Sequence, residues 1–168
     1  MTSTLPVPIR FELPGADWEA VSPESRGVTN AAFLAVRHGT GEDYEPTITI
    51  SGDWRNDSAT LAQIADESLV LARSQATEVE LLKRREMGSE HAPGITQLIG
   101  ATISMNGRSY DLRQAQAVTG LVDVHDPGKR VVVIYTFTCT YRQFETYGPE
   151  FQDFMRTVRV VPDDEAPA

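Results

Sequence analysis

The sequence predicts an α+β fold in which at least two helices pack on an antiparallel sheet. Segment 130–141 alternates its side chains between an apolar set and a second set, as a strand does. The predicted strands are joined by short links, which favour antiparallel neighbours because a parallel crossover needs roughly a dozen residues or more. Two segments, one after residue 57 and one after residue 149, place apolar residues at helical spacing.

The first predicted strand is Val7–Leu13, which stops at Pro14-Gly15. Its Ile9, Phe11 and Leu13 share one side. Two further extended segments follow, Ala31–Val36 and Pro46–Ser51.

A helix is expected to begin at Asp57 or Ser58, either of which can act as N-cap, and to end near Ala76. Apolar and small side chains recur along it at helical spacing and predict one inward stripe. That stripe consists of Leu61, Ile64, Ala65, Ser68, Leu71 and Ala72.

Four longer strands are predicted after this helix, at 78–87, 95–104, 109–122 and 130–141. Asn106-Gly107 lies between the second and third, and Asn-Gly readily adopts the positive φ angles of a type I′ hairpin. Asp126-Pro127-Gly128-Lys129 supplies the next reversal. The last helix is expected to begin near Pro149, with Phe151, Phe154, Met155 and Val158 as its buried stripe.

The strand 130–141 predicts the character of both sheet faces. Its odd positions form a core-facing set: Val131, Val133, Tyr135, Phe137, Cys139 and Tyr141. Its even positions become polar along the strand, at Thr136, Thr138 and Thr140, and neighbouring strands add Gln97, Gln114 and Gln116. A polar face of this kind either lines a wet groove or is simply solvated, and the solvated face is the favoured interpretation.

Composition limits the partners that this chain can bind. It has 15 Lys and Arg against 24 Asp and Glu, a net charge of −9, which excludes nucleic acid and anionic membrane surfaces as expected partners. No apolar run approaches the roughly 20 residues of a membrane span, and the N-terminus resembles no secretion signal, so a cytoplasmic protein is expected. The 168 residues predict one domain over 5–161 and a disordered acidic tail over 162–168.

The sequence contains no recognisable catalytic constellation, so no enzyme, metal or cofactor is expected. His38, His91 and His125 lack ligand partners at metal-binding spacing, and the single Cys139 falls on the core-facing side of its strand. The basic run Lys83-Arg84-Arg85 is flanked by glutamates, which favours pairing within the sheet over phosphate binding.

Trp54 and Arg55 are the candidate partner-binding residues. They lie together in a polar loop, and Trp and Arg are enriched among the residues that dominate protein interfaces. The competing interpretation, which is favoured, is that Trp54 folds back and caps the first helix, because most large aromatic side chains are buried.

The segment Phe11-Glu12-Leu13-Pro14-Gly15-Ala16-Asp17-Trp18, with the helix ending Asp153–Val160, resembles the Mog/PsbP-like superfamily, in its LpqN-type or DcrB-like bacterial branch. The resemblance covers nearly the whole chain through its pattern of elements. It implies an α/β/α sandwich with a six- to seven-stranded antiparallel sheet and two main helices. Members of the superfamily are mostly non-enzymatic, and many LpqN-type members are exported proteins with a signal that this sequence does not show.

These observations favour a non-enzymatic protein-interaction module, a scaffold or adaptor that holds a protein partner with the polar sheet face or the Trp54 loop. The alternative is a small-ligand binding domain whose pocket lies between a helix and the Thr- and Gln-bearing face. A homodimer through an exposed edge strand is a further expectation, because unpaired edges need protection.

Overall fold

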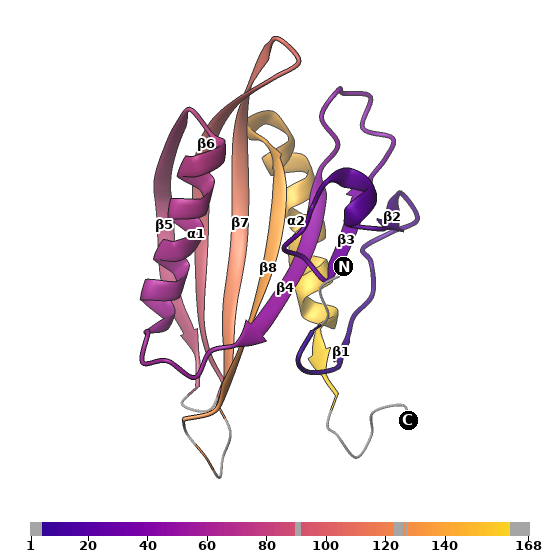
Figure 1. Cartoon of the computed structure of the whole chain (residues 1–168). Coiled ribbons are helices and arrows are strands. Elements are labelled where there is room, and N and C mark those ends of the chain that lie inside the picture. Colours follow the sequence, from indigo (N-terminus) through magenta and orange to yellow (C-terminus); the bar gives the residue numbers. More distant parts are fainter. Residues whose placement is uncertain (1–4, 90–91, 123–125, 127, 162–168) are drawn as a thin grey trace.

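Seven antiparallel strands form one sheet in the order β2-β3-β4-β8-β7-β6-β5, and a separate two-stranded sheet pairs β1 with β9 (Figure 1). The computed structural model describes residues 5–89, 92–122, 126 and 128–161. The strands are β1 (Ile9–Arg10), β2 (Trp18–Val21), β3 (Phe33–Arg37), β4 (Thr47–Trp54), β5 (Glu78–Gly88), β6 (Pro93–Met105), β7 (Arg108–Val122), β8 (Arg130–Thr140) and β9 (Arg159–Val160). The helices are a short 3-10 helix η1 (Glu24–Arg26), α1 (Leu61–Gln75) and α2 (Tyr141–Thr157).

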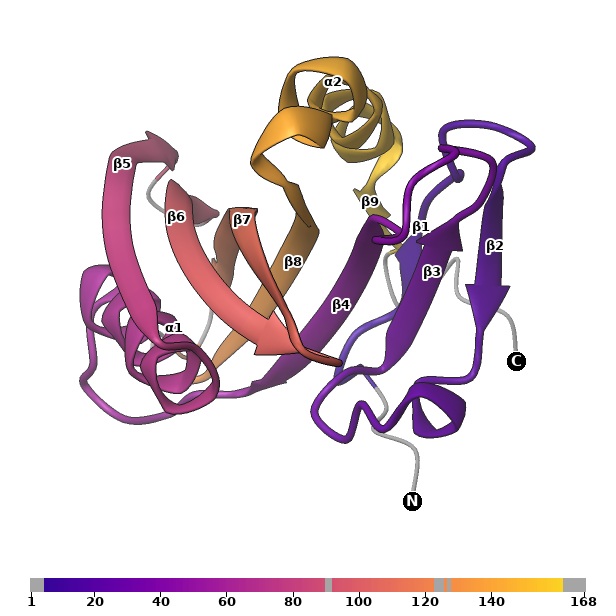
Figure 2. The ribbon, with the colours of Figure 1, turned by 90° about the horizontal axis from the view of Figure 1, so that it is seen from above.

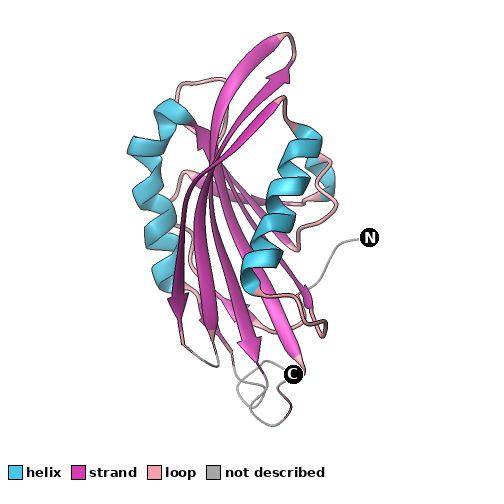
Figure 3. Cartoon of the chain, turned by 90° about the vertical axis from the view of Figure 1, so that its left-hand side faces the viewer, coloured by secondary structure: helices cyan, strands magenta, loops and turns pink. Residues whose placement is uncertain are grey.

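The two long helices lie on opposite faces of the large sheet, which makes three layers (Figure 3). α1 contacts β5, β6 and β7 on one face, whereas α2 contacts β7 and β8 on the other (Figure 2). We call these the α1 face and the α2 face of the sheet. The predicted α/β/α sandwich with an antiparallel sheet is therefore confirmed.

The strands from β5 to β8 form the predicted meander, and local turn chemistry explains it. Asn106 and Gly107 have φ angles of 54° and 77°, as the Asn-Gly hairpin requires. The N–H of Lys129 donates to the carbonyl of Asp126 at 2.9 Å in the next reversal. Because these links are short, each strand pairs with its predecessor along nearly its whole length.

β8 is central and buried on both faces. Its odd residues from Val131 to Cys139 belong to the larger core, where Phe137 stacks on Phe151 of α2 at a centroid distance of 5.5 Å. Its even residues Val132 and Ile134 pack in a second core beneath α1. The alternation predicted for this strand is confirmed from residue 131 to residue 139.

The N-terminal part of the sheet differs from the prediction. Only Ile9 and Arg10 of the expected strand 7–13 pair, because their partner β9 has two residues. A strand that the sequence did not predict, β2, forms the edge beyond β3, where Trp18 pairs with Arg37. Trp18 is buried in the larger core.

α1 begins later than expected. Neither Asp57 nor Ser58 caps it; instead the Thr60 hydroxyl accepts from the N–H of Gln63, and the Gln63 side chain accepts from the N–H of Thr60. This reciprocal capping box satisfies two backbone donors at once. The buried positions of the helix are Ile64, Ala65 and Leu69, whereas Leu71, expected inside, is 46% exposed.

α2 begins at Tyr141, eight residues before the predicted start at Pro149, because Thr140 and Gln143 form a second capping box. Pro149 lies inside this helix. The C-terminal stripe of Phe151 and Phe154 is buried as predicted. Neither α1 nor α2 combines the length and the apolarity of a bilayer-crossing helix, and the same holds throughout the described part of the chain.

Candidate functional site

A row of hydrogen bonds crosses four strands beneath α1. Arg84 of β5 donates to Oε1 of Gln97 on β6 at 2.8 Å, and Gln97 donates to Oε1 of Gln116 on β7 at 2.7 Å. Gln116 in turn donates to the hydroxyl of Thr136 on β8 at 3.2 Å. The Gln97 amide also donates to the carbonyl of Ala65 in α1 at 3.2 Å.

This row changes the interpretation of the polar sheet face. Gln97 and Gln116 are 4% and 8% exposed, so at these positions the face is neither solvated nor a wet groove. α1 lies directly on it, since Ala65 accepts a bond from Gln97 and Asp66 pairs with Arg84 at 2.8 Å. The row satisfies its own donors and acceptors, as buried polar groups must. It positions α1 on the sheet.

An open groove lies on the α2 face, where α2 leaves β5 and β6 without a covering helix (Figure 2). It has a volume of about 650 Å³, and its walls and floor come from β5, β6 and β7. The lining residues are Glu78, Val79, Glu80, Leu82, Gly100, Ala101, Thr102, Asp111 and Arg113. The sequence did not identify this site, because its residues come from three strands and match no motif.

Glycine at position 100 keeps the floor of the groove open. A Cβ there would lie 3.2 Å from both Nη1 of Arg113 and Cδ1 of Leu82. Leu82 is 41% exposed although it is apolar, so part of the groove surface is a hydrophobic side chain in contact with water. The groove therefore offers one apolar contact among charged and hydroxyl groups.

Arg113 is held rigidly at the end of the groove nearest α2. Its Nη1 donates to Asp111 at 2.7 Å and to the carbonyl of Leu112 at 3.0 Å. The ring of Tyr141 lies over the guanidinium, 4.8 Å from its carbon to the ring centroid. The sequence predicts Tyr141 on the core-facing side of a strand, but Tyr141 is the first residue of α2 and is 60% exposed. An exposed aromatic ring stacked on a fixed arginine is a ready contact surface.

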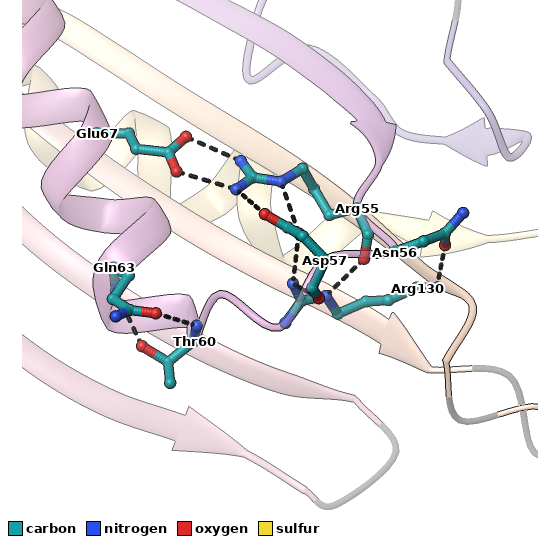
Figure 4. A network of polar contacts seen from close by, with 7 residues as sticks. All are labelled: Arg55, Asn56, Asp57, Thr60, Gln63, Glu67 and Arg130. Atoms are coloured by element: carbon teal, nitrogen blue, oxygen red, sulfur yellow. Dashed lines mark hydrogen bonds and ion pairs between the residues drawn. The ribbon is translucent and has the colours of Figure 1, made fainter.

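The structure separates the two residues that the sequence singled out. Trp54 pairs with Val131 on the α2 face and is 51% exposed, so it does not cap α1. Arg55 instead binds α1, donating to Glu67 at 2.8 and 2.9 Å and to Asp57 at 3.1 and 2.8 Å (Figure 4). The bonds to Glu67 join the end of β4 to α1. The hydrogen bonds from Arg55 also lower the pKa of the Asp57 and Glu67 carboxyls.

Two of the remaining candidates for chemistry, Cys139 and His38, lie within the described residues. Cys139 is fully buried, as predicted, and burial raises the pKa of its thiol to about 12. Nδ1 of His38 lies 2.7 Å from Glu45 in the loop between β3 and β4. His91, His125 and the predicted tail 162–168 lie outside the described residues. Within the described residues, no group of three or more His, Cys, Asp and Glu side chains is placed to hold a metal ion.

Solved structures of bacterial proteins share this fold. LpqN, involved in cell envelope biogenesis of Mycobacterium tuberculosis, aligns with a TM-score of 0.63 and 14% identity over 94% of this chain and 86% of its own. The protein of unknown function PA94 from Pseudomonas aeruginosa aligns with a TM-score of 0.53 and 22% identity, over 80% of this chain and 83% of its own. The cyanobacterial PsbP protein (CyanoP) of Synechocystis sp. PCC 6803 aligns with a TM-score of 0.55 and 11% identity, over 87% of this chain and 83% of its own.

The similarity is one of structure. No family model matches the sequence, and no curated protein matches it. The structural likeness establishes the Mog/PsbP-like fold that the sequence resemblance predicted. Because one fold hosts many functions, the function has to be argued from the site.

Proposed function

We propose that this chain is a non-enzymatic protein-interaction module, a scaffold or adaptor that binds a segment of a protein partner in the groove beside α2. The observation that carries the proposal is the pair formed by Arg113 and Tyr141 at the end of the groove. Arginine and tyrosine are enriched among the residues that contribute most to protein binding. Here Arg113 is already positioned by its bonds to Asp111 and to the backbone carbonyl of Leu112, and the ring of Tyr141 lies over its guanidinium.

Pre-organisation favours binding at this place. An arginine that is ordered only on binding loses side-chain entropy, whereas Arg113 is fixed in the unbound chain. The Arg113 guanidinium already bonds to Asp111 and to the carbonyl of Leu112, so it does not offer a free charge. We expect the partner to contact the exposed ring of Tyr141 and the edge of the groove. Leu82 offers an apolar contact on the groove floor, and Thr102 offers a hydroxyl group. This chemistry suits recognition of a polypeptide.

Site-specific photo-crosslinking tests the location of the partner. A benzophenone amino acid at Thr102, which lines the groove, is compared with one at Val70, which is 63% exposed on α1 at the other face. We expect a crosslinked protein from position 102 and not from position 70. Equal crosslinking from the two positions, or none from position 102 in the native host, contradicts the proposal.

The crosslinked partner, once purified, allows the groove to be compared with Trp54 at the end of β4. Tyr141→Ala is expected to raise the Kd at least about tenfold, the loss typical of a dominant interface residue. Trp54→Ala is the matched control, because it also removes an exposed aromatic ring from the α2 face. A large loss with Trp54→Ala and none with Tyr141→Ala would assign binding to the surface around Trp54 instead.

A small ligand is the second candidate, and the volume of the groove favours it. About 650 Å³ falls within the range of small-molecule sites. The sequence predicts the ligand pocket on the Gln- and Thr-bearing face, but α1 covers that face at Gln97. We therefore propose the groove as the ligand site instead. A thermal-shift screen tests it, since a ligand that binds the folded state raises the Tm. The shift should disappear in Thr102→Trp, which fills the groove.

The cytoplasmic location expected from the sequence belongs to the same proposal. LpqN is described as involved in cell envelope biogenesis, and this setting is not transferred to the chain through the fold alone. Fractionation of native cells with an antibody against the chain tests the location. Recovery with the envelope fraction would replace the cytoplasmic adaptor with an envelope one.

A further inference from the structure

β5 forms one edge of the seven-stranded sheet and is eleven residues long. The opposite edge, β2, has four residues. An edge strand has hydrogen-bonding groups on its outer side that the sheet does not use, and these can pair with another chain. Nearly every residue of β5 is exposed. The long edge is therefore the part of the sheet most open to a further strand.

Four charged side chains on this strand have no partner among the residues that the structure describes. Glu78, Glu80, Lys83 and Arg85 are exposed, and in the described part of the protein none of them makes an ion pair or a side-chain hydrogen bond. Arg84 differs, because it points to the α1 face and binds Asp66 and Gln97. Two free carboxylates thus precede two free cations on the same strand.

A β-bulge brings these four side chains to one face. Leu81 pairs with Ile99 and Lys83 pairs with Leu98, so Leu82 is an extra residue in β5. In a regular strand, residues 80 and 83 would point to opposite faces. The extra residue shifts the alternation by one, so Glu78, Glu80, Lys83 and Arg85 all lie on the α2 face.

We propose that a second copy of this chain pairs with β5 in antiparallel orientation about a two-fold axis between Leu81 and Leu82. In this register Glu80 lies opposite Lys83 of the second copy, and Glu78 lies opposite its Arg85. Symmetry repeats both pairs, so four ion pairs form. Because the acidic residues precede the basic ones, an antiparallel second copy places its basic residues opposite the acidic residues of the first.

Apolar surface lies where the axis passes. Leu81 and Leu82 are 37% and 41% exposed, and pairing covers these side chains in both copies. The arrangement has an apolar centre and a charged rim, as stable interfaces commonly do. The chain as a whole has a net charge of −9, but the three glutamates of β5 balance its lysine and two arginines. The two copies therefore meet along a strand with no net charge, which limits the repulsion between two acidic chains.

Pairing does not depend on the proposed function, although it affects the groove. Glu78, Glu80 and Leu82 line the groove at its β5 side, so the two grooves of a dimer lie next to one another across the joined strands. The test below measures association of the chain without any partner. Its failure and the failure of partner binding are therefore separate results.

Sedimentation equilibrium of charge variants tests the register. Glu80→Lys places two lysines opposite each other at both symmetric positions, and Lys83→Glu places two glutamates there. Each variant alone is expected to dimerise at least about tenfold more weakly than the wild type. An equimolar mixture of the two variants should restore the dimer, because each lysine then faces a glutamate of the other chain. High salt should weaken the wild-type dimer.

Glu86→Lys is the matched control. It makes the same change of charge on the same exposed strand, but Glu86 lies on the α1 face and opposite no charge in the proposed register. Circular dichroism should show that all variants fold. A wild type that stays monomeric into the millimolar range, a dimer that neither single variant weakens, or a mixture that stays as weak as its components each overturns the proposal.

Discussion

The side-chain amide of Gln97 donates a hydrogen bond to the side-chain oxygen of Gln116, 2.7 Å away, beneath α1. The two residues are directly paired on β6 and β7. Both are almost fully buried, so each depends on the other to satisfy its polar atoms.

Gln97→Met should therefore destabilise the chain by about 2–3 kcal/mol, because it keeps the volume but leaves buried groups of Gln116 and Ala65 unpaired. Gln114→Met is the control, since Gln114 is half-buried and makes one longer bond of 3.3 Å to Thr138. We expect it to cost less than about 1 kcal/mol. Urea denaturation measures both values, and equal losses would contradict a special role for Gln97.

The two capping boxes should differ in strength. Gln143 is 1% exposed and also donates to the carbonyl of Tyr44 at 2.7 Å, whereas Gln63 of the first box is exposed. Gln143→Ala is expected to cost about 2–3 kcal/mol and Gln63→Ala about 0.5–1 kcal/mol. The free energy of unfolding of both variants checks this ranking. A reversed order would show that the contact with Tyr44 contributes little.

The ion pairs of Arg55 should make stability depend on acid pH. They lower the pKa of Asp57 and Glu67 from ordinary values of 3.8 and 4.5. Carboxyls whose pKa is lower in the folded chain stabilise it above their unfolded pKa, and lose this effect as the pH falls through the folded pKa. Arg55→Met should thus lower the Tm by a few degrees at neutral pH.

This difference in Tm should shrink as the pH falls from 4.5 to below 3.8, because protonated carboxyls no longer attract Arg55. Arg156→Met is the comparison, since Arg156 and its partner Asp153 are both strongly exposed at 73% and 62%. Such a pair contributes little at any pH. A Tm difference for Arg55→Met that stays constant across this range would contradict the predicted role of the two carboxyls.

The two tryptophans should respond differently to a quencher. Trp18 is 5% exposed and donates from Nε1 to Glu150 at 2.8 Å, whereas Trp54 is 51% exposed. Acrylamide should quench the fluorescence of Trp18→Phe, which retains Trp54, much more than that of Trp54→Phe. Similar quenching of the two variants would mean that Trp54 is covered in solution.

Much of the fold could be predicted because its signals are local. The strands from β5 to β8 follow from alternating side chains and from the turn at Asn106-Gly107. The starts of both helices were also present in the sequence, as the Thr-x-x-Gln boxes at 60–63 and 140–143. The prediction for the second helix was wrong because Pro149 suggested a start, although it lies in the middle of a helix capped upstream.

The candidate site could not be predicted, because it depends on which helix covers which face. The sequence predicts a solvated face at Gln97 and Gln116, and only the position of α1 shows that they are buried. Arg113 and Tyr141 are distant in the sequence, and side-chain alternation predicts Tyr141 as the last residue of a strand that in the structure ends at Thr140. Likewise β2 is a strand because β3 pairs with it, not because of its own residues.

The small sheet of β1 and β9 joins the two ends of the described chain, with Ile9 directly opposite Val160. The path of the backbone is therefore almost a closed ring. A circular permutant can be made by linking the segment before β1 to the segment after β9 and opening the chain at the exposed Asn106-Gly107 turn, where no side chain packs against Gly107. Such a molecule keeps every strand pair and leaves the β5 edge free of new termini.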